Sequence, residues 1–212
     1  MTRDGKTIPE WELKELQSDL GGRLALSCSL LCQNSTVRKV DDQWRAIGDP
    51  TDSACAVFGW KVFHDTEDYR RKNPRFREFT FDRERKRMTT IHEMDGERWV
   101  FSKGAIGPYL PRISHVIEDG KMVQMADRHR TRIGEVNLEM ASDALRVIAL
   151  TARQLGPDED IDDVELVETG LIFLGLVGIM DPPRQEVADA IALCHKAGIQ
   201  VKMITGDQQM TA

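Results

Sequence analysis

The chain has 212 residues, of which 41% are hydrophobic and 30% charged. This is the profile of a packed globular protein, and the length allows one full domain plus a fragment or two small domains. Its net charge of -6 includes no long block of one sign, which disfavours a general nucleic-acid-binding surface. The most apolar run, Leu171 to Met180, has about half of the roughly 20 residues that a membrane helix needs, so we expect a soluble chain. Four cysteines without CxxC spacing and five isolated histidines argue against a zinc site or a disulfide framework.

The first third of the chain is predicted to hold two helices separated by a short strand. Residues 23–32 (RLALSCSLLC) are an apolar run of helical length, which predicts a buried helix. A strand over residues 44–47 leads into a GDPT segment, where Thr51 can cap a helix that runs to about Val62. The inner face of this second helix is expected to carry Ala54, Val57 and Phe58.

Residues 75–103 predict two β-hairpins in succession. Three extended runs alternate with two turn signals, the polar residues 83–86 and the pair Asp95-Gly96. Asp-Gly between extended runs favours a tight hairpin because both residues accept a positive φ. Successive hairpins indicate an antiparallel meander and an α+β fold.

The tip of the first hairpin combines an aromatic ring with concentrated positive charge. Phe81 is followed by Arg83, Arg85, Lys86 and Arg87, a surface that suits a purine carrying phosphates. The same residues also fit a solvated basic turn with Phe81 in the core, and the segment alone does not decide between the two.

A second candidate lies where the third extended run ends. Lys103 is followed by Gly104 and Ala105, and such small residues let a ligand approach the backbone closely. A lysine followed by a glycine turn is also common without any function, so this signal is weak by itself.

In the second half of the chain, the predicted pattern of helices and strands changes near residue 180. A helix is predicted over residues 126–143, followed by a strand over 145–152, an acidic loop and a buried strand over 171–179. Two consecutive prolines then require a stiff joint. Beyond them, a helical stripe closed by Gly198 and a strand over 199–204 indicate α/β alternation, so we place a domain boundary near residue 180.

Six motifs occur in an order and spacing that resemble the cytoplasmic part of P-type cation-transporting ATPases, in particular the calcium-pump-like subgroup. The motifs are GDPT at residue 48, FDRERKRM at 81, KGA at 103, LRVIAL at 145, DPPR at 181 and MITGD at 203. The resemblance implies an antiparallel-sheet nucleotide-binding domain flanked by helices over 1–180. It also implies a fragment of the haloacid-dehalogenase-like phosphorylation domain over 181–212.

This resemblance assigns roles to individual residues. It implies that Phe81 stacks on the adenine of ATP and that Arg146 reaches toward the phosphates. Asp52 stands where the subgroup usually carries a glutamate, one methylene longer. The other pocket residues it implies are Arg83, Lys86, Lys103 and Gly104.

The C-terminal motifs receive roles in the same way. Thr205, Gly206 and Asp207 match the loop that helps to hold the γ-phosphate end in related pumps. The segment Asp181, Pro182, Pro183 and Arg184 matches the hinge between the two domains.

Two family motifs are missing from the sequence. It contains neither the DKTGT motif, whose aspartate accepts the phosphoryl group in related pumps, nor the TGDGxxDxP segment that helps to hold Mg²⁺. We therefore expect a chain that binds ATP without turning it over. The implied partners are ATP and the phosphorylation, actuator and membrane domains of a pump, at the cytoplasmic face of a membrane. The transported cation is left open.

Parts of the sequence also suggest two other classes of function. A self-sufficient phosphatase of the haloacid-dehalogenase type is suggested by the TGD segment, but it needs a nucleophilic aspartate after a first strand, which the sequence does not offer. A nucleic-acid-binding module using residues 83–87 is disfavoured by the acidic net charge.

Overall fold

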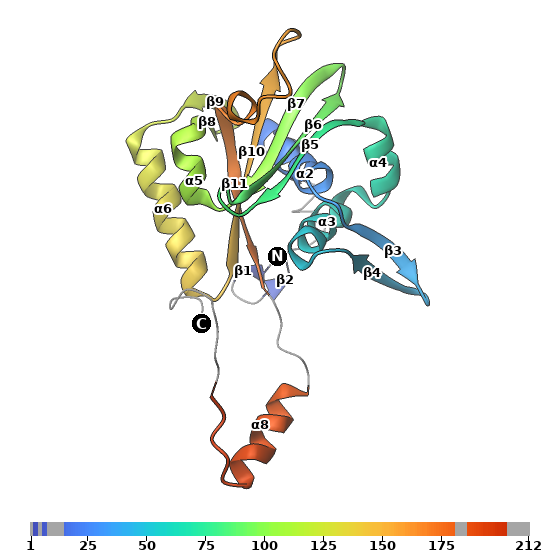
Figure 1. The fold of residues 1–212 in the computed structure, drawn as a ribbon, viewed down its shortest axis with the longest axis vertical. Helices are drawn as coiled ribbons and strands as arrows, with labels where there is room; N and C mark the ends of the chain where they lie inside the picture. Colours follow the sequence, from blue (N-terminus) through green and yellow to red (C-terminus); the bar gives the residue numbers. More distant parts are fainter. Residues whose placement is uncertain (1, 4–5, 8–14, 181–185, 203–212) are drawn as a thin grey trace.

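A computed structural model describes residues 2–3, 6–7, 15–180 and 186–202 (Figure 1). Its centre is a sheet of seven strands flanked by helices. The strands of this sheet are β5 (Arg75–Asp82), β6 (Arg87–Met94), β7 (Glu97–Gly104), β8 (Ile113–Glu118), β9 (Lys121–Gln124), β10 (Arg146–Leu155) and β11 (Leu171–Ile179). Two small antiparallel sheets pair β1 (Thr2–Arg3) with β2 (Lys6–Thr7) and β3 (Thr36–Val40) with β4 (Gln43–Ile47).

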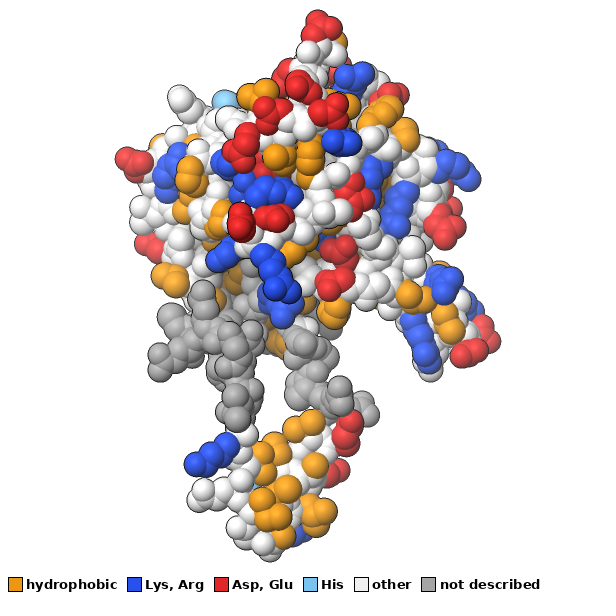
Figure 2. Space-filling model, viewed as in Figure 1, with side chains coloured by type: hydrophobic (Ala, Val, Ile, Leu, Met, Phe, Trp, Pro, Cys, Tyr) orange, Lys and Arg blue, Asp and Glu red, His pale blue; other side chains and the backbone are white. Residues whose placement is uncertain are grey.

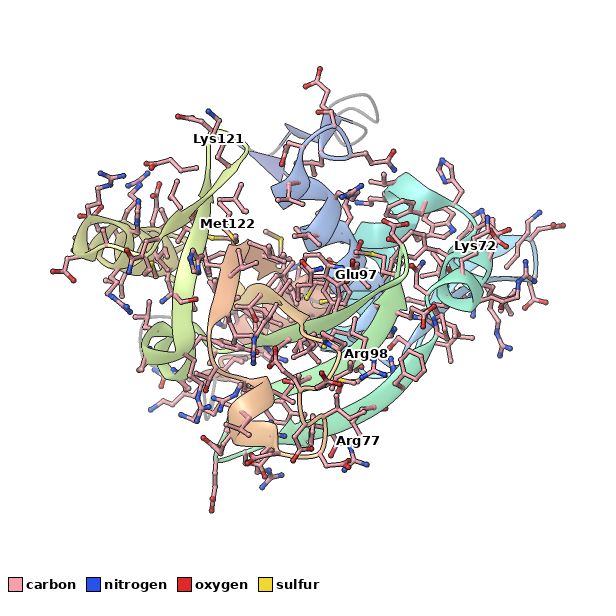
Figure 3. The ribbon with its side chains drawn as sticks, turned by 90° about the horizontal axis from the view of Figure 1, so that it is seen from above. Lys72, Arg77, Glu97, Arg98, Lys121 and Met122 are labelled. Carbon is pink, nitrogen blue, oxygen red and sulfur yellow. The ribbon has the colours of Figure 1, made fainter. Side chains whose placement is uncertain are left out.

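The order in the large sheet is β5-β6-β7-β10-β11-β8-β9. All neighbours are antiparallel except β11 and β8, which run parallel, so the predicted antiparallel sheet is confirmed with one exception. The strands β8 and β9 were not predicted from the sequence. Seen from above in Figure 3, Lys121 and Met122 of β9 mark one end of the sheet and Arg77 of β5 marks the other.

Helices cover both faces of the sheet (Figure 1). On one face α2 (Leu20–Leu31) packs against β7, β10 and β11, and it is itself covered by α3 (Pro50–Phe63) and α4 (Thr66–Lys72). On the other face lie α5 (Ile106–Tyr109), the short 3₁₀ helix Leu110–Arg112, α6 (Asp127–Ser142) and α7 (Val164–Val167). The strand β10 alternates between the two cores, with Leu150 facing α2 and Ala149 facing α5 and α6.

The predicted helix over residues 51–62 is confirmed with two corrections. Its N-cap is Asp49, whose side chain accepts the amides of Thr51 and Asp52, so Thr51 lies inside the first turn. Its buried residues are Cys55, Ala56, Gly59 and Val62, and the predicted inner face is therefore displaced around the helix. A Cβ on Gly59 would lie 2.3 Å from Leu30 Cγ, so α2 and α3 cross too closely for a larger residue to fit there.

The hairpins appear where the sequence predicts them. Asp95 and Gly96 both have positive φ, 55° and 79°, as the Asp-Gly signal requires. In the turn between β5 and β6, the Asp82 carboxylate accepts the amides of Glu84 at 2.9 Å and Arg85 at 2.8 Å. This capping fixes the backbone of the basic tip.

The helix α8 (Val187–Lys196) contains no buried residue, and Figure 2 shows hydrophobic side chains gathered on its visible face. Within the predicted strand over 199–204, residues 199–202 are irregular, because no described strand lies beside them to supply hydrogen bonds. The hinge residues Asp181, Pro182, Pro183 and Arg184 lie outside the described residues. The fragment of a second domain expected over 181–212 therefore stays a prediction.

Candidate functional site

A cavity of about 480 Å³ opens at the edge of the sheet between β5 and the start of α3. Its walls come from the end of β5, the adjoining ends of β6, β7 and β10, and the first turn of α3. The lining residues are Asn34, Asp49, Thr51, Asp52, Glu78, Thr80, Phe81, Met88, Lys103, Gly104, Arg146 and Ile148. Five residues that the sequence nominated, from four separate segments, thus line one cavity.

An ion pair lies at the bottom of this cavity. The ammonium of Lys103, only 4% exposed, donates to the Asp52 carboxylate, whose other oxygen accepts the backbone amide of Asn34 at 2.8 Å. Burial by itself lowers the pKa of Lys103, but attraction to the thiolate forms of Cys55 and Cys32 and to the Asp52 carboxylate outweighs that effect and raises the pKa. Lys103 is therefore an ammonium at neutral pH.

Phe81 forms the open wall of the cavity. Its side chain is 62% exposed, so the alternative that places it in the core is wrong. Met88 and Ile148, which are 4% and 7% exposed, supply further apolar surface in the same cavity. One open aromatic face beside apolar walls suits a flat ring.

A β-bulge explains how Phe81 comes to face the cavity. Phe79 pairs with Thr89 and Asp82 with Arg87, so β5 has one more residue than β6 in this stretch. In a regular strand Thr80 and Phe81 would point to opposite faces. The extra residue lets both line the cavity.

Gly104 has a structural reason to be glycine. A Cβ at this position would lie 2.3 Å from the carbonyl oxygen of Lys86 and 2.6 Å from Arg87 Cβ. The close packing of β7 on the start of β6 therefore requires this glycine, which also lines the cavity. The approach of a ligand to its backbone stays a prediction.

Arg146 lies at the start of β10, in contact with the first turn of α3. Its Nη1 donates to Thr51 Oγ1 at 3.2 Å, and its side chain is exposed. Because Asp49 already caps the first-turn amides of α3, this guanidinium is the exposed cation of the lining that can meet an anionic group.

The cations at the hairpin tip divide into two groups. Arg83 and Lys86 are exposed and do not line the cavity. Arg85 and Arg87 donate to the buried carboxylate of Glu168, each at 2.5 Å, so the two guanidiniums share one negative charge and are held within the protein. Of the five charged groups on the lining, only Lys103 and Arg146 are cationic.

Several lining residues were missed by the sequence reasoning. Asn34 Nδ2 donates to Glu78 Oε1 at 2.8 Å, and Arg75 Nη1 donates to both Asn34 Oδ1 and Glu78 Oε2 at 2.7 Å. Asn34 follows the helix predicted over residues 23–32, and nothing in the local sequence pattern links it to β5.

Three nominated residues, Thr205, Gly206 and Asp207, lie outside the described residues. A larger hollow of about 700 Å³ lies elsewhere, between Arg23, Tyr69, Lys72 and the turn at Asp95. None of the nominated residues lines it. Its two aromatic rings, Tyr69 and Phe63, pack against each other in a tilted arrangement, and Tyr69 Oη lies 2.7 Å from Ser27 Oγ. The smaller cavity is therefore the candidate site.

Comparison with known proteins agrees with this fold. The family model described as "P-type ATPase, cytoplasmic domain N" matches residues 23–186. The chain belongs to the P-type ATPase family. The predicted relationship is thereby confirmed for the sheet domain that carries the cavity.

Named relatives include pumps from bacteria and animals. The chain is 38% identical over 191 residues to "Calcium-transporting ATPase 1" of Bacillus cereus, covering 90% of this chain and 21% of that protein. It is 38% identical over 188 residues to "Cation-transporting ATPase pma1" of Synechocystis, with 88% and 20% covered, and 33% identical over 218 residues to "Plasma membrane calcium-transporting ATPase 1" of Mus musculus, with 98% and 18% covered. The chain spans about a fifth of the length of these curated relatives.

Two features are absent from the described residues. No helix among them has the length and apolar character needed to cross a membrane. Within the same residues, no group of three His, Cys, Asp or Glu side chains is placed to hold a metal ion.

Proposed function

We propose that the cavity beside Phe81 binds ATP for a P-type cation pump. The observation that carries this proposal is the exposed ring of Phe81 over a cavity whose floor holds the buried Lys103–Asp52 pair. An aromatic face, apolar walls and a few polar groups at fixed positions are what recognise an adenine ring.

The charged residues of the lining indicate which part of the cavity would hold the phosphates and which would hold the adenine. The floor already neutralises Lys103 with Asp52, and Asp49 and Glu78 add further negative charge. The four phosphate charges of ATP are therefore better placed near Arg146, the exposed cation of the lining. Adenine then occupies the region between Phe81, Met88 and Lys103.

The curated relatives are about five times longer than this chain. A whole pump of this kind would couple ATP hydrolysis to cation transport. The sequence has no DKTGT motif, so the acceptor aspartate belongs to another part of such a pump and this chain positions the nucleotide. The phosphorylation, actuator and membrane domains would be its partners at the cytoplasmic face of the membrane. Residues 181–184 would be the hinge, and Thr205, Gly206 and Asp207 would meet the γ-phosphate end.

Mg²⁺ accompanies ATP in this family. The described residues present no group of carboxylates for it, and we assign none of them to the metal. The ion would add charge neutralisation at the phosphates when it is bound.

The direct test is a chemical-shift titration of the 212-residue chain with ATP, ADP and AMP. We expect dissociation constants of about 0.1 to several mM, with shifts around Phe81 and Lys103 for all three nucleotides, since the base contacts are shared. Phosphate release should equal that of a buffer blank. Absence of any shift at saturating millimolar ATP would refute the proposal.

A further inference from the structure

A buried carboxylate lies directly behind the wall of the cavity. Glu168, at the C-cap of α7, is completely buried, and its Oε1 accepts Arg85 Nη1 at 2.5 Å and Thr89 Oγ1 at 2.6 Å. Its Oε2 accepts Arg87 Nε at 2.5 Å. One side chain from about 80 residues further along the chain thus joins three residues of the β5–β6 hairpin.

The two arginines pass this anchoring on to the backbone that carries Phe81. Arg85 Nη2 donates to the carbonyl of Thr80 at 2.8 Å, the residue directly before Phe81 and inside the bulge. Arg87 Nη1 donates to the carbonyl of Arg85 at 3.0 Å and so fixes the opposite side of the turn. The conformation of the bulge therefore depends on both guanidiniums being held by Glu168.

The same carboxylate also orders the β6–β7 side of the cavity. Because Thr89 donates its hydroxyl proton to Glu168, Ser102 Oγ is the donor to Thr89 Oγ1 at 2.6 Å or, in its other orientation, to the carbonyl of Met88 at 3.0 Å. Met88 pairs directly with Lys103 across the two strands. A continuous buried network runs from Glu168 to residues on two walls of the cavity.

We propose that Glu168 is a positioning residue for the nucleotide site, which it never touches, acting through Arg85 on the bulge that presents Phe81. This inference rests on the proposed function of the cavity. According to this inference, Arg85 and Arg87 hold Phe81 in position for its contact with adenine and do not bind phosphate. Loss of the anchor therefore weakens AMP and ATP by the same factor.

The experiment compares Glu168→Gln with the matched control Glu165→Gln. Glu165 lies three residues earlier on the same helix, is 63% exposed and pairs with Arg112, which is far from the hairpin in sequence. We expect Glu168→Gln to weaken AMP and ATP binding about fivefold to tenfold each, a part of the full stacking contribution, and Glu165→Gln to change neither. Amide shifts of Thr80 and Phe81 should move in the free Glu168→Gln protein.

Arg85→Met provides a second variant in case Glu168→Gln does not fold. Arg85 is 19% exposed, and its replacement leaves Arg87 paired with Glu168. It should weaken AMP and ATP equally, and the double variant should bind no more weakly than Glu168→Gln, because the two residues act through one contact. Folded Arg85→Met protein that binds AMP as the wild type does, or that loses ATP affinity alone, would overturn the inference. Failure of the wild type and Glu165→Gln to bind any nucleotide would instead overturn the proposed function.

Discussion

The strands β5 and β6 form one hairpin and have similar lengths and similar alternating sequences. They differ in burial and in their role in the structure. Every residue of β6 except Glu93 is buried, including the polar Arg87, Thr89, Thr90 and His92. The strand β5 lies at the edge of the sheet and exposes Phe76 and Phe81. The inner strand holds the fold together, and the edge strand, broken by a bulge, presents the ring that faces the cavity.

The largest effect should come from Arg87→Ala on β6. Arg87 is 3% exposed and lies over the ring of Tyr109, and its removal leaves the fully buried Glu168 with one partner fewer. Breaking such a buried pair costs about 3–5 kcal/mol of unfolding free energy. Urea denaturation followed by circular dichroism measures this.

The matched control for that substitution is Arg77→Ala on β5. The side chains of Arg77 and its partner Asp162, whose Nη2 and Oδ1 atoms are 3.1 Å apart, are 45% and 74% exposed. The loss of unfolding free energy should therefore stay below about 1 kcal/mol. Equal losses for the two arginines would contradict the division between the strands.

The next effect is a pH dependence carried by His92. Burial lowers its pKa from the ordinary 6.5 to about 4, and the carbonyl of Asn73, 3.0 Å from Nδ1, only partly opposes this. The unfolded chain then binds more protons than the folded one between pH 6.5 and 4. The stability that neutral His92 provides is present above pH 6.5 and is lost as the pH falls through this window, by about 3 kcal/mol in all.

Substitution isolates this contribution from those of the carboxylates. His92→Gln should reduce the fall in unfolding free energy between pH 7 and 4, measured by urea titrations at each pH. His195→Gln, at an exposed position on α8, should leave the slope as in the wild type. A His92→Gln slope as steep as that of the wild type would show that His92 takes up its proton without cost.

Much of the hairpin pair could be predicted from sequence because turn signals and alternation are local. The strands 75–82, 87–94 and 97–104 and the helices over 20–31 and 127–142 all lie where the pattern placed them. Which strand is the edge could not be predicted, because β5 and β6 carry the same alternation and only the pairing of β7 with β10 decides the order. The short strands β8 and β9 lack such signals and were missed.

The residues of the site also divide into those that local sequence signals predict and those that come together only in the folded chain. Phe81, Lys103 and Arg146 were found through motifs whose residues lie close together in sequence. Glu168 was not, because it follows an acidic loop and resembles any solvated glutamate until Arg85 and Arg87, more than 80 residues earlier, are seen beside it. Asn34 and Glu78 likewise meet only in the folded chain.

A smaller effect, on binding and not on stability, is expected for Phe81→Ala on the edge strand. Loss of the ring should weaken ATP and AMP alike by about 1–3 kcal/mol, the value of base stacking on an aromatic side chain. Phe76→Ala is the control, since Phe76 lies on the same strand, is 53% exposed and does not line the cavity. Isothermal titration or chemical-shift titration should show wild-type affinity for Phe76→Ala. Unfolding of Phe81→Ala would mean that the ring supports the fold despite its exposure.

The smallest effect belongs to the exposed tip that joins the two strands. The family resemblance places Arg83 and Lys86 in the nucleotide pocket, whereas both side chains point into solvent and neither lines the cavity. Any contact with the phosphates would be made by long, solvated side chains, so Arg83→Ala and Lys86→Ala should each weaken ATP binding by less than about 1 kcal/mol. The loss should be greater for ATP than for AMP and should fade as salt is raised, because exposed charges are screened over about 8 Å at physiological ionic strength. Titrations at low and high salt measure this. If Arg83→Ala costs as much as Phe81→Ala and the loss survives high salt, the tip closes over the bound nucleotide, and the boundary between the anchored and the binding parts of the hairpin has to move to include it.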